Sequence, residues 1–416
     1  MKPAMSRPVL FLLLCSLFVF ESSADQLHYN NILIGNRAAG LGGAYSAISD
    51  DASGLYYNPA GIVFSNTLQL SASANAVHSS TLTYKNVLNG EDWTRETSSI
   101  VPNFFGMTSR LGKGYFGFSY AVTDFEVEDQ DTRLTNVSGL SLFIINIKNT
   151  DKVTKLGPSY AIKINDQWNV GATLYMHDRE KDLVQNQFIR LVGSNQYESS
   201  NLFFETVETG IEPILGFIWT PHKDWSIGGS LRQVTIVSST TRVQNFCASD
   251  VSQSEQCLPV AASVRDPTIE SSTGKRKLPV NIRLGVAYFP SPQFLVSADI
   301  SHFGSVRSDS FNAEEVLNFA VGLEYYINAT WAIRGGYFTN LSNTPEIDSN
   351  SINQTDHVDL TGISFSATKF SKTSSITVGY SGSSGSGEAQ VIAGSNAIQD
   401  LDQSVNTLYL STSYSF

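Results

Sequence analysis

The sequence lacks the features that mark several common classes of protein. Beyond residue 24 there is no apolar run approaching the roughly 18 residues that a membrane-spanning helix requires, so membrane helices are excluded. Basic residues are few, 27 against 38 acidic ones, and the net charge of −11 argues against nucleic acid as a partner. No HExxH, Walker or GxSxG motif occurs. The sequence therefore predicts no enzyme activity.

The sequence also gives little support for a metal or cofactor site. The six histidines are scattered, and no spacing among them suggests a shared metal ion. The run Gly40-Leu41-Gly42-Gly43 only faintly resembles a dinucleotide-binding loop, because no buried strand precedes it. We therefore predict no metal and no cofactor.

The first 24 residues have the pattern of a secretory signal peptide. Lys2 and Arg7 are followed by the apolar run Val9–Phe20, which is too short to span a bilayer. Ser22-Ser23-Ala24 then supplies the small residues of a cleavage site, and we expect cleavage after Ala24. The mature protein is therefore expected to be exported.

Two cysteines remain after this cleavage, Cys247 and Cys257. They flank a polar stretch, and export places them in an oxidising compartment. A disulfide that closes a small loop is favoured over a metal site, because no histidine pattern accompanies the pair.

Apolar residues alternate with small or polar ones from Thr67 almost to the end of the chain. In Val280–Phe289 and Leu317–Tyr325, for example, large apolar residues lie on one face, and small or polar residues lie on the other. The apolar face of such a strand meets another sheet in a soluble sandwich and lipid in a membrane barrel.

The links between these strands alternate between very short and long. The short links lie around residues 112–114, 165–167, 221–224, 290–292, 328–330 and 371–373. The long polar links lie around residues 79–99, 125–152, 181–206, 242–275, 341–356 and 383–403, with a shorter one near 306–314. Short turns on one rim and long loops on the other are typical of bacterial outer-membrane barrels. Residues 67–416 are therefore predicted to form an all-β, antiparallel transmembrane barrel of about 14 strands.

The segment before the strands, residues 25–66, is rich in Gly, Ala and Ser. It has too little side chain to build a core of its own. A barrel of about 14 strands has a lumen too wide for its own side chains to fill. We therefore predict that residues 25–66 form a hatch that plugs the lumen.

The run RAAGLGGAYSAISDDASGLYYNPAGI, with its Asn58-Pro59-Ala60 match, resembles the N-terminal hatch of the FadL/TodX-like outer-membrane transport proteins. Leu278–Ser305 is similar to the paired strands of their C-terminal half, and the last strand, ending in Phe416, resembles the sorting signal read by the barrel-assembly machinery. The resemblance implies passive uptake of long-chain fatty acids or other hydrophobic molecules. In relatives the ligand is thought to shift the hatch and leave sideways into the membrane.

The hatch contains most of the candidate site residues. Asn58, Pro59, Ala60 and Gly61 have the sequence of a tight turn that would fix the hatch backbone. Gly42 and Gly43 favour close backbone packing, and Asp50 and Asp51 supply charge within the plug.

Two arginines of the strands are candidate ligand-binding residues. By the alternation, Arg283 and Arg334 face the lumen, since facing lipid would cost about 2–4 kcal/mol near the bilayer midplane. Either could bind a ligand carboxylate, but pairing within the protein, with Asp50 and Asp51, is the favoured interpretation.

An acidic run is interpreted as a solvated outer loop rather than a divalent-cation site. It consists of Asp124, Glu126, Glu128, Asp129 and Asp131. A weak calcium bridge to lipopolysaccharide stays open.

These observations predict a channel in the bacterial outer membrane, surrounded by its lipid and lipopolysaccharide and gated by the hatch. Two alternatives stay open. The barrel could be a scaffold for protein secretion or surface attachment, with the loops 181–206 and 242–275 docking partner proteins. An outer-membrane hydrolase would need a Ser/His or Asp/His pair assembled on neighbouring strands.

Overall fold

The computed structural model describes residues 27–65, 68–88, 90–134, 140–250, 268–307, 312–391 and 396–416. The predicted signal peptide, residues 1–24, and Cys257 lie outside the described residues. Among the residues it does describe, no helix is long and apolar enough to cross a membrane.

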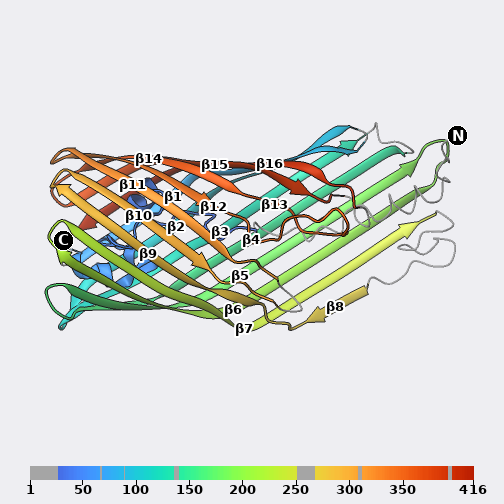
Figure 1. The fold of residues 1–416 in the computed structure, drawn as a ribbon. Coiled ribbons are helices and arrows are strands. Elements are labelled where there is room, and N and C mark those ends of the chain that lie inside the picture. Colours follow the sequence, from blue (N-terminus) through green and yellow to red (C-terminus); the bar gives the residue numbers. More distant parts are fainter. Residues whose placement is uncertain are drawn as a thin grey trace.

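The chain forms a closed, antiparallel β-barrel of 14 strands, so the predicted fold class is confirmed (Figure 1). Closure comes from pairing of the first strand with the last, from Gln69 opposite Ser415 to Tyr84 opposite Leu401. The wall strands are β1 (Leu68–Leu88), β2 (Glu91–Leu111), β3 (Gly114–Leu134), β4 (Leu140–Lys163), β5 (Trp168–Leu191), β6 (Tyr197–His222), β7 (Trp225–Ser249), β9 (Lys277–Ser291), β10 (Phe294–Phe303), β11 (Val316–Asn328), β12 (Trp331–Asn340), β14 (Leu360–Phe370), β15 (Ser374–Ala389) and β16 (Gln399–Ser415).

Two further short strands add length to the wall without adding to the strand count. β8 (Thr268–Ser272) pairs with β7 ahead of β9, and β13 (His357–Val358) pairs with β15 ahead of β14. The even count of 14 and the predicted short turns on one rim are therefore both observed.

The predicted long loops are largely wrong. Most of residues 79–99, 125–152, 181–206 and 383–403 are strand, and β4 to β7 contain 24 to 26 residues each, against 10 in β10 and β12. These strands extend well beyond the shorter ones, at the rim opposite the short turns (Figure 1). Their polar residues suggest loops, but many of them face inward and pair between nearby strands of the wall, as Arg179 of β5 does with Asp151 of β4.

The outer face of the barrel is apolar where the shorter strands run. In β9, β11 and β14 the exposed residues are Val280, Ile282, Leu284, Val286, Tyr288, Leu317, Phe319, Val321, Leu323, Tyr325, Ile327, Ile363 and Phe365. Aromatic pairs stack close to the short turns, among them Trp168 with Trp219 and Trp225 with Tyr288. An apolar band flanked by aromatic side chains is the lipid-facing surface of membrane barrels.

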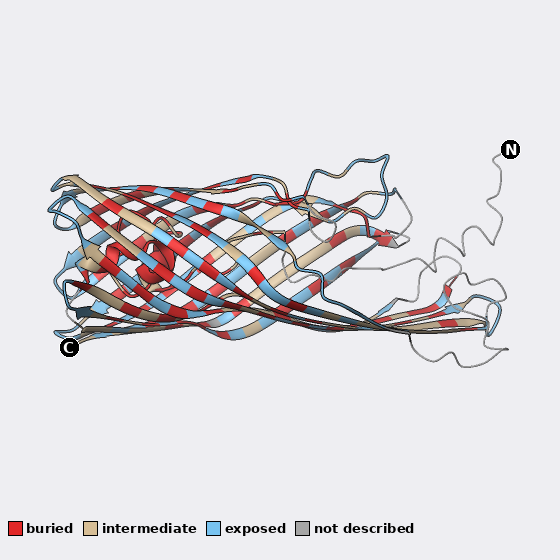
Figure 2. Cartoon of the chain, turned by 90° about the horizontal axis from the view of Figure 1, so that it is seen from below, coloured by how far each residue is buried: buried red, intermediate tan, exposed pale blue. Residues whose placement is uncertain are grey.

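The N-terminal segment, residues 27–65, lies inside the barrel (Figure 2). It contains three short helical elements, α2 (Asn36–Gly40), α3 (Gly54–Tyr57) and the 3-10 helix η1 (Pro59–Phe64). Most of its residues are buried, including Ile34, Leu41, Tyr45 and Leu55. It occupies the end of the lumen nearest the short turns (Figure 1).

Candidate functional site

Glycines of the wall make room for the N-terminal segment. They form three cross-strand pairs, each of two directly opposed glycines that face the lumen. The pairs are Gly171 with Gly216, Gly228 with Gly285, and Gly322 with Gly336. A side chain at any of the six would collide with the segment or with a side chain that holds it. The wall therefore meets the segment backbone to backbone.

The first of these pairs contacts the turn that sequence analysis singled out. A Cβ at Gly171 would lie 2.6 Å from the carbonyl carbon of Pro59, and one at Gly216 would collide with the side chain of Asn58. The Asn58 amide nitrogen donates to the backbone oxygens of Ser46, at 2.7 Å, and Phe217, at 2.8 Å. Asn58 thus ties two parts of the segment to the wall.

The predicted tight turn is the first turn of η1. The Oδ1 atom of Asn58 accepts a hydrogen bond from the amide of Ala60 at 3.2 Å, and Pro59 occupies the first helical position. Proline suits this position because its missing N–H has no helical partner there. Ala60 and Gly61 are buried in the same turn, and a Cβ at Gly61 would collide with the backbone of Ser49.

Gly42 and Gly43 both adopt positive φ angles, 66° and 87°. Gly42 also approaches the wall closely, since a Cβ there would lie 3.2 Å from the carbonyl oxygen of Tyr337. Glycine is favoured at both positions because other residues rarely adopt such angles.

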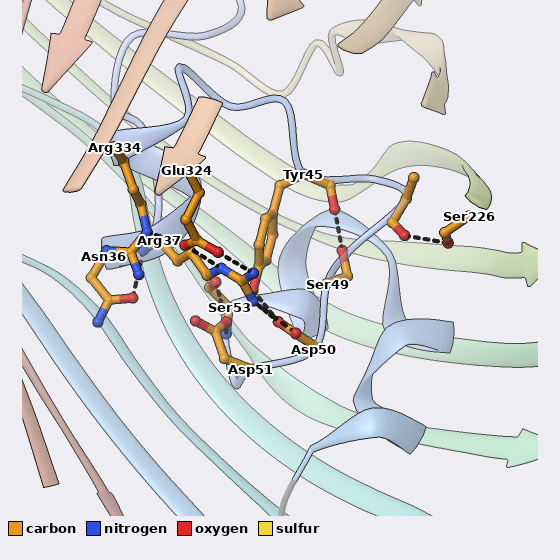
Figure 3. A network of polar contacts seen from close by, with 11 residues as sticks. Asn36, Arg37, Tyr45, Ser49, Asp50, Asp51, Ser53, Ser226, Glu324 and Arg334 are labelled. Carbon is orange, nitrogen blue, oxygen red and sulfur yellow. Dashed lines mark hydrogen bonds and ion pairs between the residues drawn. The ribbon is translucent and has the colours of Figure 1, made fainter. Parts of the chain in front are cut away.

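A buried ion network anchors the segment on β11 and β12 (Figure 3). Arg37 donates two hydrogen bonds to Glu324, at 2.9 and 2.6 Å, and two more to Asp50, at 2.6 and 2.7 Å. Arg334 donates to the same Glu324 at 2.5 Å and to Thr368. Glu324 therefore joins an arginine of the segment to an arginine of the wall.

This network corrects the predicted partners of the acidic residues. Asp50 pairs with Arg37, and not with Arg283 or Arg334, because Arg37 lies beside it within the same segment. Asp51 accepts hydrogen bonds from the amide and hydroxyl of Ser53, at 2.8 and 2.5 Å. Burial and the charge of Asp50 raise the pKa of the Asp51 carboxyl above its ordinary value.

Arg283 does face the lumen, as predicted, and is 5 % exposed. Its guanidinium donates to Asn30 of the segment at 3.0 Å and lies 5.3 Å from the ring centre of Tyr57. It borders a void of about 30 Å³, large enough for little more than a water molecule. Arg283 therefore supports the segment, as Arg334 does through Glu324.

Tyr56 lies among three cationic side chains. Lys155 and Arg232 lie 5.7 and 4.6 Å from its ring centre, and Arg283 lies 6.0 Å away. Burial by itself would raise the pKa of Tyr56, but these positive charges outweigh burial and lower it. Arg232 also donates to the backbone oxygen of Tyr56.

The lumen holds a cavity of about 230 Å³ above the segment. Its apolar lining comes from the segment and from strands on both sides, and consists of Leu27, Leu33, Leu82, Phe125, Phe338, Leu360, Val391 and Val405. Tyr84, whose hydroxyl donates to Asp356 at 2.9 Å, and Arg95 also border it. Polar residues outnumber the apolar ones in the lining, so the cavity combines apolar surface with many polar groups.

Beside this cavity the wall is open. β2 and β3 pair at Thr97 and Glu128 and again from Phe104 and Ala121, but residues 98–103 and 122–127 have no partner across this seam. A β-bulge between Val122 and Asp124 disturbs β3 at the same level. Phe125, from the unpaired stretch, lines the cavity.

The acidic run predicted as an outer loop is part of β3, so that prediction is wrong. Asp124 and Glu126 line the cavity, and Glu128 is fully buried in a bidentate pair with Arg95, at 2.8 and 2.6 Å. Asp129 and Asp131 are exposed on the outer face. No group of three or more His, Cys, Asp or Glu side chains suited to a metal ion occurs within the described part of the chain.

Cys247 lies in β7, and its sulfur is disulfide-bonded. Its pairing with Cys257 stays a prediction, because Cys257 lies outside the described residues.

Sequence reasoning missed Arg37, the glycine pairs and the open seam. Arg37 is the one lysine or arginine between residues 25 and 84, which is a signal for a charge with a fixed partner. The alternation places Gly285 and Gly322 on the small or polar face of their strands, but the pairing of such glycines across strands depends on the register, which one sequence does not give. Pro102, a residue that cannot donate to a β-ladder, was the available signal for the open seam.

Comparison with known proteins establishes the fold of this chain and does not extend to its function. No protein-family model and no curated protein matches the sequence. A FadL homologue of Pseudomonas aeruginosa has 14% identity and a TM-score of 0.65, with 92% of this chain and 99% of that chain covered. The toluene transporter TodX of P. putida has 14% identity and a TM-score of 0.62, with 94% and 98% covered. The monoaromatic hydrocarbon channel CymD has 14% identity and a TM-score of 0.61, with 93% and 99% covered. The resemblance predicted from the hatch sequence is thus confirmed for the fold.

Proposed function

We propose that this protein is a passive channel of the bacterial outer membrane for hydrophobic molecules, long-chain fatty acids being one candidate class. The apolar outer band, the predicted signal peptide and the fold shared with named hydrocarbon channels support this location and role. Outer-membrane lipid and lipopolysaccharide would surround the barrel. The barrel-assembly machinery would recognise its last strand, which ends in Phe416.

The observation that carries the proposal is the contact between the cavity and the open seam. Asp124, Phe125 and Glu126 line the cavity and belong to the stretch of β3 that has no partner on β2. Unpaired backbone is tolerated in a membrane barrel where it borders a cavity. A hydrophobic molecule in the cavity would then leave sideways between β2 and β3, towards lipid.

The N-terminal segment would act as the hatch of this channel. It fills the lumen at the short-turn end, and its side chains Ile32 and Ile34 pack in one cluster with Val101 and Val122 of the open seam. A ligand would therefore be kept from the periplasmic end by Asn58 to Gly61, Gly42, Gly43 and the ion network of Asp50. Arg283 and Arg334 would hold the hatch in place rather than bind the ligand.

The test is uptake of radiolabelled oleate and naphthalene by host cells that lack their own channel of this kind, with and without this protein. Uptake of either probe above that of the barrel-free cells is the expected result. If neither enters faster, although heat-modifiable gel mobility shows a folded barrel, the channel function is wrong and the scaffold alternative gains support.

A matched pair of variants tests the hatch. Gly336→Val would push a side chain into the backbone of Leu41 and Gly42, whereas Gly335→Val places the same side chain on the outer face of β12. Overpacking costs about 1–3 kcal/mol, so we expect only Gly336→Val to loosen the hatch and admit vancomycin. Equal vancomycin sensitivity of the two variants would contradict the hatch role.

A further inference from the structure

The rim of the barrel that carries the short turns is basic, although the chain as a whole has a net charge of −11. The six short turns, taken with the three strand residues on either side of each, contain two aspartates and six lysine or arginine side chains. The basic side chains are all exposed, and they are Arg110, Lys113, Lys163, Lys223, Lys369 and Lys372. Both aspartates already have partners at this rim, Asp166 with Lys163 at 3.0 Å and Asp224 with His222 at 3.3 Å.

The opposite ends of neighbouring strands are acidic. At that end of β2, β3, β15 and β16, Arg133 is the one exposed lysine or arginine among the residues that the structure describes. The exposed carboxylates at the same end belong to Glu91, Asp92, Glu96, Asp129, Asp131, Glu388, Asp400 and Asp402. The basic character is therefore a property of one rim and not of the whole surface.

Four of the basic side chains at the short-turn rim are available to an outside partner. Lys113, Lys223 and Lys372 lie in turns, and Lys369 lies at an outward position of β14. None of the four forms an ion pair with any residue in the described part of the chain. The other two basic residues occupy inward positions at the ends of their strands.

The available cations lie where the apolar outer face of the barrel ends. Leu111, two residues before Lys113, is 56 % exposed, and Trp331, directly opposite Lys369, is 41 % exposed. The ammonium nitrogen of Lys369 lies 5.8 Å from the centre of the Trp331 ring. Tryptophan rings favour the boundary between hydrocarbon and headgroups, and lysine side chains extend from it to the headgroups. The short-turn rim would therefore present its positive charge at the level of lipid headgroups.

The basic residues are spread around the barrel and do not gather in one patch. They follow the turns between β2 and β3, β4 and β5, β6 and β7, and β14 and β15, whereas the turns at residues 290–293 and 328–330 carry no charged side chain. A compact protein would contact only part of such an arc, but membrane lipids surround the whole barrel. Anionic lipids attract basic side chains near the membrane surface. Lipid is therefore the partner that this arrangement fits.

We propose that the short-turn rim binds anionic phospholipids of the adjacent membrane leaflet through Lys113, Lys223, Lys369 and Lys372. The inference rests on the proposed membrane location and is independent of the molecule that the channel carries. The basic arc includes the turn that joins β2 to β3, so these lipids would also lie at the short-turn end of the open seam.

The test is quenching of tryptophan fluorescence by brominated lipids in vesicles that contain the full-length mature protein. Four of the five tryptophans lie beside the short turns, namely Trp168, Trp219, Trp225 and Trp331. Competition between brominated phosphatidylglycerol and phosphatidylcholine gives their relative binding constant. We expect phosphatidylglycerol to bind about fivefold more tightly at low salt, the ratio that one basic residue near an anionic surface supplies. The preference should weaken at high salt, which screens exposed charges.

Two variants that each remove four positive charges locate the effect. The rim variant combines Lys113→Gln, Lys223→Gln, Lys369→Gln and Lys372→Gln. The control variant removes four exposed cations from the outer face beyond the apolar band, by Arg133→Gln, Lys148→Gln, Arg190→Gln and Arg242→Gln. The rim variant should bind the two lipids equally, whereas the control variant should keep the wild-type preference.

The other outcomes separate this inference from the proposed function. No preference in wild-type protein, a wild-type preference in the rim variant, or its loss in the control variant would each refute lipid binding by the rim. Quenching by neither lipid would refute the membrane location and this inference together. A normal lipid preference in a protein that transports no probe would overturn the channel and uphold the lipid site. Heat-modifiable gel mobility verifies that every variant is folded.

Discussion

Two seams of the same barrel differ in how completely they are closed. Between β5 and β6 every residue from Trp168 to Arg190 has a partner, and Gly171 and Gly216 in this seam meet the N-terminal segment. Between β2 and β3, residues 98–103 have no partner across the seam, and Ile100 is 75 % exposed. The wall that holds the segment is continuous, and the wall beside the cavity is interrupted.

The comparison extends to what the segment contacts on each side. On the side of β5 to β12 it is held by glycine pairs, by Asn58 and by the Glu324 network. At the open seam its polar contact is the bond from the Asn103 amide to the backbone oxygen of Leu33, at 3.2 Å. These polar contacts thus hold the segment mainly on one side of the lumen, whereas apolar packing predominates at the open seam, and such packing can rearrange around an apolar molecule.

The largest expected effect comes from closing the open seam. Ile100 and Phe125 lie in the two unpaired stretches that border this seam. We expect that joining the Ile100→Cys/Phe125→Cys variant with a short bifunctional thiol reagent reduces naphthalene uptake to that of barrel-free cells, because the exit can no longer widen. The unlinked double variant provides the reference rate.

The same link at the closed seam is the control. Glu180 and Val207 are directly opposed between β5 and β6, so linking Glu180→Cys/Val207→Cys changes no open path. This variant should keep its uptake after linking. If a linked β2–β3 seam still carries naphthalene, the exit lies elsewhere.

The second largest effect is expected where the Glu324 ion network holds the segment on β11 and β12. Glu324→Gln keeps the shape of the side chain but leaves Arg37 and Arg334 buried without their shared carboxylate. Removing one partner of a buried ion pair typically costs about 3–5 kcal/mol. We expect the segment to leave its position, so that trypsin cleaves after Arg37.

The readout is specific, since Arg37 is the one trypsin site between residues 25 and 84. Glu315→Gln provides the control, because Glu315 pairs with His302 at an exposed position. Protection of Arg37 in the Glu324→Gln variant equal to that in wild-type protein would show that the network does not hold the segment.

Different parts of the wall also differ in how well their strands could be predicted from the sequence. Strands such as Val280–Phe289 were predictable because their apolar residues face outward at every second position and their turns are short. The extent of β4 to β7 was not, because residues such as Asp151 and Arg179 pair inside the lumen and make the strands look like polar loops. Charged and polar residues that pair inside the lumen make these strands polar overall, so the difference between an apolar and a polar face, from which strands are predicted, is hard to see in the sequence.

The site was less accessible from sequence than the fold. Asn58 and its neighbours could be identified from their turn-forming residues. The partner of Arg37 could not, since Glu324 is 287 positions away. The open seam is a property of two strands together, and neither β2 nor β3 alone reveals which of its residues lack a partner.

The smallest effect is expected at Asn58, the residue that ties the segment to the closed side. Asn58→Ala removes hydrogen bonds to the backbone of Ser46, Phe217 and Ala60 and leaves two carbonyls unsatisfied, at a cost of about 1–3 kcal/mol. Amide hydrogen exchange should therefore rise in residues 46–60 while the strands stay protected. Asn165→Ala is the matched control, because Asn165 accepts from Gln167 and Trp168 at a short turn. Loss of heat-modifiable mobility in Asn58→Ala would show that Asn58 is needed for the barrel to fold. Faster exchange confined to residues 46–60 would show that Asn58 holds the N-terminal segment against the closed seam.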